Sequence, residues 1–124
     1  MELIIGGAYQ GKLEYALKHY GLTGADVFDC RDFSFEGGTK PDFSKKIIYH
    51  FEAYVLACMR AGVNPLEGLP EDAVIISDDI FCGVVPIDTE IRAWREECGR
   101  TLTAIAARSS SVTRIFCGLP ARIK

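Results

Sequence analysis

The stretch "MELIIGGAYQGKL", residues 1–13, contains a short apolar run, a glycine-rich turn and the first residues of a periodic segment. Gly6, four further residues, then Gly11 and Lys12 have the spacing of a phosphate-binding loop. Such a loop needs glycines that let the backbone curl, a helix whose N-terminus favours an anion, and a lysine that reaches the outer phosphates. The sequence meets all three conditions, and the alternative is a tight turn with an exposed lysine.

We therefore predict that a nucleotide's phosphates contact every residue of this loop: Gly6, Gly7, Ala8, Tyr9, Gln10, Gly11, Lys12 and Leu13. Leu13 stands where such loops carry a Ser or Thr whose hydroxyl binds Mg²⁺. Binding of Mg²⁺ would then depend on carboxylates and water, which this ion accepts. Leu13 is also expected to be the first core residue of the following helix.

The rest of the chain alternates between continuous apolar runs and segments with helical periodicity. The predicted strands are residues 3–6, 25–30, 73–79 and 111–119, and the predicted helices are 11–21, 44–61 and a third that starts at Pro86. Strands that are apolar throughout, rather than alternating, indicate a mainly parallel sheet with both faces covered. We predict an α/β, three-layer P-loop NTPase-like fold that forms one nucleotide-binding domain over residues 1–124.

The predicted strand "AVIISDD", residues 73–79, ends in two acids. In parallel sheets, sites form beyond the carboxyl ends of the strands, and P-loop proteins bind magnesium with an acid placed in this way. Asp78 and Asp79 are the predicted metal ligands, and Asp79 and Lys12 are the predicted catalytic residues. A pair of solvated acids at a strand end is the alternative, and Asp29 is a weaker candidate for the same role.

Composition excludes several classes of protein. The 124 residues carry a net charge of -3, so nothing favours non-specific binding to nucleic acid or an anionic membrane. No apolar run approaches the roughly 18 residues of a membrane span, and no signal peptide is visible. The five cysteines lack CxxC spacing, which predicts buried, reduced thiols in a cytoplasmic protein rather than disulfides or a zinc site.

Four segments, in order along the chain, resemble one known family. They are GGAYQGKL at 6–13, SDDIFCGVVP at 77–86, WREECGRTLT at 94–103 and VTRIFCGLPARIK at 112–124. They are similar to GGxxSGKS, TNEVGxGIVP, FRDxAGRVNQ and the lysine-ending tail of the bifunctional adenosylcobinamide kinase/adenosylcobinamide-phosphate guanylyltransferase family of cobalamin biosynthesis. Gln10, Leu13, Asp78 and Leu102 depart from these patterns. The resemblance covers about the first 17 and the last 50 residues.

The resemblance implies transfer of the γ-phosphoryl of ATP or GTP, with Mg²⁺, to the hydroxyl of adenosylcobinamide, and it suggests a homo-oligomer. Family members are longer and carry an HxxxRP-like stretch whose histidine takes GMP covalently; this sequence has no such stretch. His50 is predicted to lie on a helix flank and His19 on the surface. Three hypotheses stay open: a kinase of this type, a paralogue that binds nucleotide or a corrinoid-pathway partner without turnover, and a small kinase for another metabolite.

Overall fold

The structure is a computed structural model that describes residues 1–80 and 88–124. Its strands are β1 (Glu2–Gly6), β2 (Val27–Asp29), β3 (Ile47–Tyr49), β4 (Val74–Asp78), β5 (Ser111–Phe116) and β6 (Leu119–Arg122). Its α-helices are α1 (Lys12–Tyr20), α2 (Phe51–Ala61) and α3 (Thr89–Arg108). Two short 3-10 helices, η1 (Gly24–Asp26) and η2 (Glu36–Gly38), lie before and after β2.

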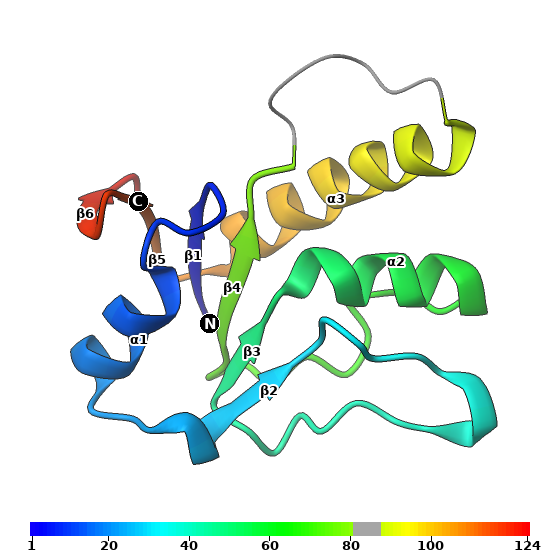
Figure 1. The fold of residues 1–124 in the computed structure, drawn as a ribbon, viewed down its shortest axis with the longest axis horizontal. Helices are drawn as coiled ribbons and strands as arrows, with labels where there is room; N and C mark the ends of the chain where they lie inside the picture. The colour runs from blue at the N-terminus through cyan, green and yellow to red at the C-terminus, as the bar shows by residue number, and fades with distance from the viewer. Residues whose placement is uncertain (81–87) are drawn as a thin grey trace.

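The strands form one sheet in the order β2-β3-β4-β1-β5-β6, with β1 at the centre between β4 and β5. Neighbouring strands are parallel except β6, which pairs with β5 in the antiparallel direction. Helix α1 covers one face of the sheet, and α2 and α3 lie side by side over the other (Figure 1). The predicted α/β fold with three layers and a mainly parallel sheet is confirmed.

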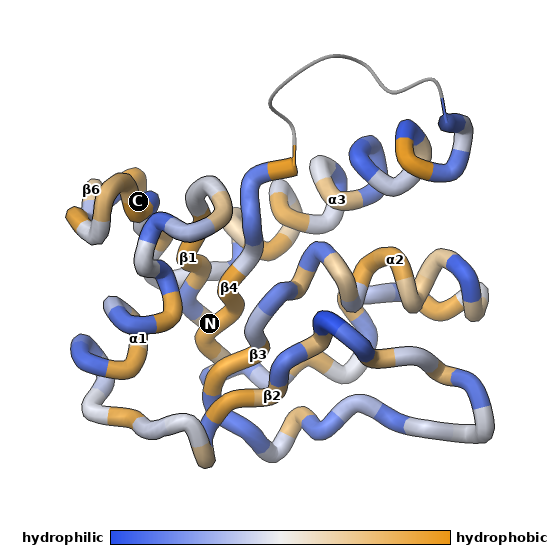
Figure 2. Tube along the Cα trace, in the orientation of Figure 1, coloured by the Kyte–Doolittle hydropathy of each residue, from blue (hydrophilic) through white to orange (hydrophobic). Residues whose placement is uncertain are grey.

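Each face of the sheet has its own apolar core, because successive strand residues point to opposite faces. In β1, Leu3 packs with the α2–α3 side and Ile4 with the α1 side. In β4, Ile75 faces α2 while Val74 and Ile76 face α1. The central strands β1 and β4 therefore carry runs of consecutive apolar residues (Figure 2), and each fully buried aliphatic side chain contributes about 1.5–3 kcal/mol.

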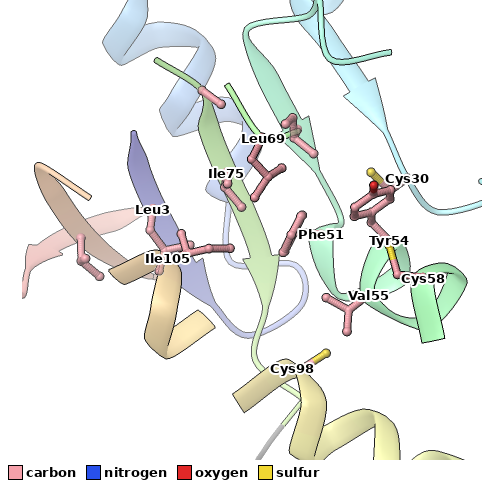
Figure 3. Close-up of a cluster of buried hydrophobic side chains, with 13 residues drawn as sticks. Leu3, Cys30, Phe51, Tyr54, Val55, Cys58, Leu69, Ile75, Cys98 and Ile105 are labelled. Carbon is pink, nitrogen blue, oxygen red and sulfur yellow. The ribbon is translucent and has the colours of Figure 1, made fainter. Parts of the chain in front are cut away.

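The larger core lies between the sheet and helices α2 and α3. Phe51, Tyr54 and Val55 of α2 fill its centre next to Ile75, with Cys98 of α3 at one side (Figure 3). The three residues of α2 are at most 1% exposed. Their spacing is the helical periodicity seen in the sequence, so this part of the predicted helix is confirmed.

The first part of the predicted helix 44–61 is wrong, because Ile47–Tyr49 is strand β3. Ile47 and Ile48 are fully buried between β2 and β4, where a β-branched side chain packs well. His50 then takes a left-handed conformation, with φ 56° and ψ 50°, and the helix begins at Phe51. The coincidental helical spacing of Ile47, Phe51 and Tyr54 hid this boundary.

The last predicted strand is also different: it is a hairpin of β5 and β6 rather than one strand. Cys117 and Gly118 form its two-residue turn, with φ values of 51° and 75°. Positive φ at both central residues matches the twist of an antiparallel hairpin. The predicted strand 111–119 runs through Gly118, so the reversal of the chain at this glycine is a correction to it.

Helix α3 begins at Thr89, and the carboxylate of Asp88 accepts a hydrogen bond from the Ile91 amide 3.1 Å away. The predicted start at Pro86 lies outside the described residues. Ile91, in the first turn of α3, is 41% exposed and lies outside the core. In the described parts of the chain, no helix is both long and apolar enough to cross a membrane.

Four cysteines lie within the described residues, and all four are free thiols. Cys30, Cys58 and Cys98 are buried, as predicted, and burial raises the pKa of each thiol. Cys117 is exposed, which corrects the prediction for that residue, because it occupies the turn of the β5–β6 hairpin. Cys82 lies outside the described residues.

Candidate nucleotide site

The loop between β1 and α1 has a backbone that only glycine accommodates at its first position. A Cβ atom placed on Gly6 would lie 2.5 Å from the carbonyl oxygen of Ile115 on the neighbouring strand β5. At the other end of the loop, Gly11 caps α1 in the left-handed region, with φ 84°. The glycines therefore allow close packing against β5 and a sharp entry into the helix, as the loop hypothesis requires.

Lys12 is the first residue of α1, and its side chain is only 3% exposed. Its Nζ donates to the Gly7 carbonyl at 2.6 Å and forms an ion pair with Asp78 Oδ1 at 2.7 Å. The parallel register places Gly6 opposite Asp78, so the loop and the end of β4 necessarily meet. The alternative of a turn with an exposed lysine does not fit this geometry.

Asp79 occupies a different place from Asp78. Its amide donates to the Gly6 carbonyl at 2.7 Å, and its carboxylate lies 3.9 Å from the Arg114 guanidinium. Asp79 lines a second, mostly apolar cavity of about 410 Å³ between α3 and the sheet, whereas Asp78 lines both this cavity and the one beside the loop. The structure therefore brings Asp78, rather than Asp79, to Lys12.

Leu13 is a core residue, as expected. It is partly buried against the cluster of Ile4, Ala16 and Ile47 on the α1 side of the sheet. It supplies no oxygen for a metal, and Asp78 is already paired with Lys12. The described residues contain no group of three or more His, Cys, Asp or Glu side chains placed to hold a metal ion.

The loop, α1 and the ends of β3 and β4 line a cavity of about 850 Å³. This volume lies within the range of small-molecule and cofactor sites. Loop residues 8–12 form one part of its wall, and Arg31, Tyr49 and His50 form another. Phosphates on the loop would therefore share one cavity with side chains that follow β2 and β3.

His50 was expected on a helix flank, and the structure corrects this placement. It follows β3 at the carboxyl edge of the sheet, is 7% exposed and lines the large cavity. Its Nδ1 lies 2.8 Å from Asp29 Oδ1, and its Nε2 lies 3.2 Å from Arg31 Nη2. The helix predicted over residues 44–61 obscures this cluster, because β3 lies inside that range; a histidine directly after an apolar strand is the sequence signal for it.

Glu52, near the start of α2, holds the end of β4 in place. Its Oε1 accepts the Asp78 amide at 3.0 Å, while its Oε2 has no hydrogen-bond partner among the described residues. Glu52 is 6% exposed, and burial, aided by the nearby Asp78 charge, raises the pKa of its carboxyl to about 7. The Trp94 indole donates to the Glu52 carbonyl at 2.7 Å and ties α2 to α3.

Gln10, which replaces the serine of the family pattern, connects the loop to the β5–β6 turn. Its side-chain oxygen accepts the Cys117 amide at 2.6 Å, and its carbonyl accepts the Gly118 amide at 2.8 Å. Gly118 also lines the large cavity. Gln10 therefore fixes the turn against the loop.

Comparison with known proteins agrees with this geometry. Residues 39–123, more than half of the chain, match the family described as cobinamide kinase / cobinamide phosphate guanyltransferase. The chain belongs to this family. The match includes residues 39–74, in which the sequence analysis found no resemblance, and it begins after the loop at 6–13. A search of curated proteins finds no match.

Membership supports a general function like that of a cobinamide kinase/guanyltransferase, in cobalamin biosynthesis, with a nucleotide and cobinamide as the family's substrates. Within the matched stretch lie His50, Glu52 and Asp78, which surround the carboxyl edge of the sheet. Gly6 and Lys12 lie before the matched stretch, so their contacts come from the structure alone.

Proposed function

We propose that this chain binds ATP or GTP with the phosphates on the loop at 6–13 and transfers the γ-phosphoryl to the hydroxyl of cobinamide. The observation that carries the proposal is the position of Lys12 Nζ, buried in the cavity wall between the Gly7 carbonyl and Asp78. An ammonium group at this position is close to where the loop amides would hold a phosphate chain.

Lys12 would stabilise negative charge on the transferring phosphoryl group, together with the amides of residues 7–13. Magnesium enters this proposal only as part of the nucleotide substrate, because the protein lacks the hydroxyl ligand at Leu13. Asp78 is the carboxylate nearest to Lys12 and would orient the substrate's hydrated ion. Asp79 remains the second proposed ligand, and it approaches from the α3 side.

The test is a paired measurement of nucleotide affinity and of γ-phosphate transfer, with and without cobinamide, in the presence of Mg²⁺. Lys12→Ala is expected to abolish transfer and to weaken binding. Because alanine leaves Asp78 without its partner, Lys12→Gln is a second variant whose amide can still donate to Asp78. Lys18→Ala, which removes an exposed lysine from the same cavity, is the matched control and is expected to keep activity.

The second candidate is a family member that binds nucleotide without turnover. Leu13 favours it, since this residue is packed into the core and removes the usual metal ligand. Tight nucleotide binding with no transfer to cobinamide or another alcohol would support this candidate. Absence of binding by either nucleotide would contradict both candidates. Guanylyl transfer is not part of the proposal, because the HxxxRP-like stretch is missing.

A further inference from the structure

The backbone around the large cavity is strained at three places. Among the described residues, Tyr9, His50 and Cys117 are the non-glycine residues with positive φ, at 60°, 56° and 51°. Tyr9 and His50 line the cavity, and Cys117 precedes Gly118, which also lines it. Strained residues of this kind collect at functional sites, where the surrounding structure maintains them. Of the three, only His50 is buried.

The two contacts of the His50 ring determine where its proton lies. A guanidinium group has only donors, so Nε2 must accept the hydrogen bond from Arg31 at 3.2 Å. Nδ1 then carries the proton and donates to Asp29 Oδ1 at 2.8 Å. Asp29 is held in turn by the Arg31 amide at 2.9 Å. The ring is therefore held with the lone pair of Nε2 directed at a hydrogen-bond donor, which is Arg31 in this structure.

Two carboxylates, those of Glu14 and Asp78, also line this cavity, and Glu14 is exposed. The Asp78 carboxylate already forms an ion pair with Lys12 Nζ at 2.7 Å, which leaves it less available to an incoming hydroxyl. Among residues 1–80 and 88–124, the Arg31 side chain is the hydrogen-bond partner of His50 Nε2, and Arg31 is an exposed residue that lines the same cavity. Phosphates in the cavity offer this guanidinium a stronger, bidentate partner than a neutral ring nitrogen.

We propose that His50 is the general base for the acceptor hydroxyl, with Asp29 as the residue that positions its ring. This inference rests on the proposed phosphoryl transfer. Arg31 moves from Nε2 to the phosphates, and the acceptor hydroxyl takes its place. The hydroxyl proton passes to Nε2 while the acceptor oxygen bonds to the γ-phosphorus. The bond from the γ-phosphorus to the bridging oxygen breaks, and the nucleoside diphosphate leaves with that electron pair.

Asp29 stabilises the imidazolium that results, since its carboxylate is already hydrogen-bonded to Nδ1–H. General bases of this kind contribute about 10²–10⁴-fold to a rate. His50→Asn is therefore expected to lower kcat by about 10²-fold or more and to leave nucleotide affinity within about threefold. Asparagine tolerates the left-handed conformation of residue 50, so the fold should persist.

Two controls separate a base from a structural residue. His19→Asn changes the other histidine of the chain, which is exposed on α1 and stacks on Tyr15, and it should lower kcat far less than His50→Asn does. His50→Gly relieves the positive φ and leaves room for free imidazole, which should restore part of kcat without changing KM for the nucleotide. Nitrogen NMR of the ligand-free protein should show the His50 proton on Nδ1.

The outcomes are distinguishable. Transfer by the native chain with an unchanged kcat in His50→Asn overturns the role of His50 and leaves the proposed function standing. Nucleotide adducts on His50 found by mass spectrometry overturn it as well, because the ring would then be a nucleophile. Loss of kcat in His50→Asn, with rescue of His50→Gly by imidazole, supports it. Absence of any transfer by the native chain overturns the proposed function and this role together.

Discussion

Replacement of Glu52 by glutamine should stabilise the protein at neutral pH. Glu52 is 6% exposed, and its Oε2 has no hydrogen-bond partner among the described residues. Burial raises the pKa of this carboxyl from 4.5 to about 7 in the folded protein. The folded state therefore binds the proton more tightly than the unfolded state does, and stability decreases as the pH rises between these two values.

The magnitude follows from that interval. At about 1.4 kcal/mol per pH unit, the change from 4.5 to about 7 costs the folded state about 3 kcal/mol. This loss of folding stability is absent below pH 4.5 and complete above about pH 7. It is a large part of the 5–15 kcal/mol that stabilises a typical domain. Glu52→Gln removes the charge and keeps an oxygen that can accept the Asp78 amide.

Urea denaturation of both proteins between pH 4 and pH 8 measures this effect. Subtracting one stability curve from the other cancels the contributions of all other titrating groups. The free energy of unfolding of Glu52→Gln, relative to that of the native protein, should increase by about 3 kcal/mol from pH 4 to pH 8, with most of the change between pH 5 and pH 7. A carboxyl carbon signal of Glu52 that titrates near pH 7 would agree. A constant difference, or an advantage that shrinks with pH, would refute the reasoning, because Glu52 would then be ionised in the folded protein.

Four further substitutions test the loop. Gly6→Ala should destabilise the protein by about 2–3 kcal/mol in urea denaturation, since its Cβ would lie 2.5 Å from the Ile115 carbonyl oxygen. Gly7→Ala should cost less than about 1 kcal/mol, because its nearest contact is a side-chain atom at 3.7 Å. Leu13→Ser should raise Mg²⁺-dependent nucleotide affinity about tenfold, measured by calorimetry. It should also lower the free energy of unfolding by about 2 kcal/mol, because Leu13 packs in the core beneath α1. An unchanged affinity would show that the site lacks more than a hydroxyl. Gln10→Ala should speed amide hydrogen exchange in the β5–β6 turn, since it removes a 2.6 Å hydrogen bond; unchanged exchange would mean that the backbone bonds alone hold the turn.

Part of the candidate site was predictable because it is local in the chain. Gly6, Gly11 and Lys12 lie within seven residues, and their spacing indicates a strand, a turn and a helix that must follow one another. Asp78 was predictable for a similar reason, since it ends a continuous apolar strand. The loop after β1 and the acid at the end of β4 lie next to each other because the carboxyl ends of neighbouring parallel strands meet at one edge of the sheet.

The cluster at His50 was not predictable in this way. Asp29 ends β2, Arg31 follows two residues later, and His50 follows β3. These three residues meet only because β2 and β3 are neighbours in the sheet. β3 has three residues, too few for periodicity to identify it, and Ile47 shares helical spacing with Phe51. Burial between two strands decided the conformation there, and local pattern did not.

The sequence by itself therefore determined the α/β class, the glycine turn between β1 and α1, and the family, because each depends on residues that are close together or on motifs in order. Tertiary structure alone decided that Lys12 is buried against Asp78, that Asp79 faces another cavity, and that His50 lies between Asp29 and Arg31. The physical reason is the same in each case. Strand order and register choose which strand ends are neighbours, and burial at that edge sets which side chains must be paired.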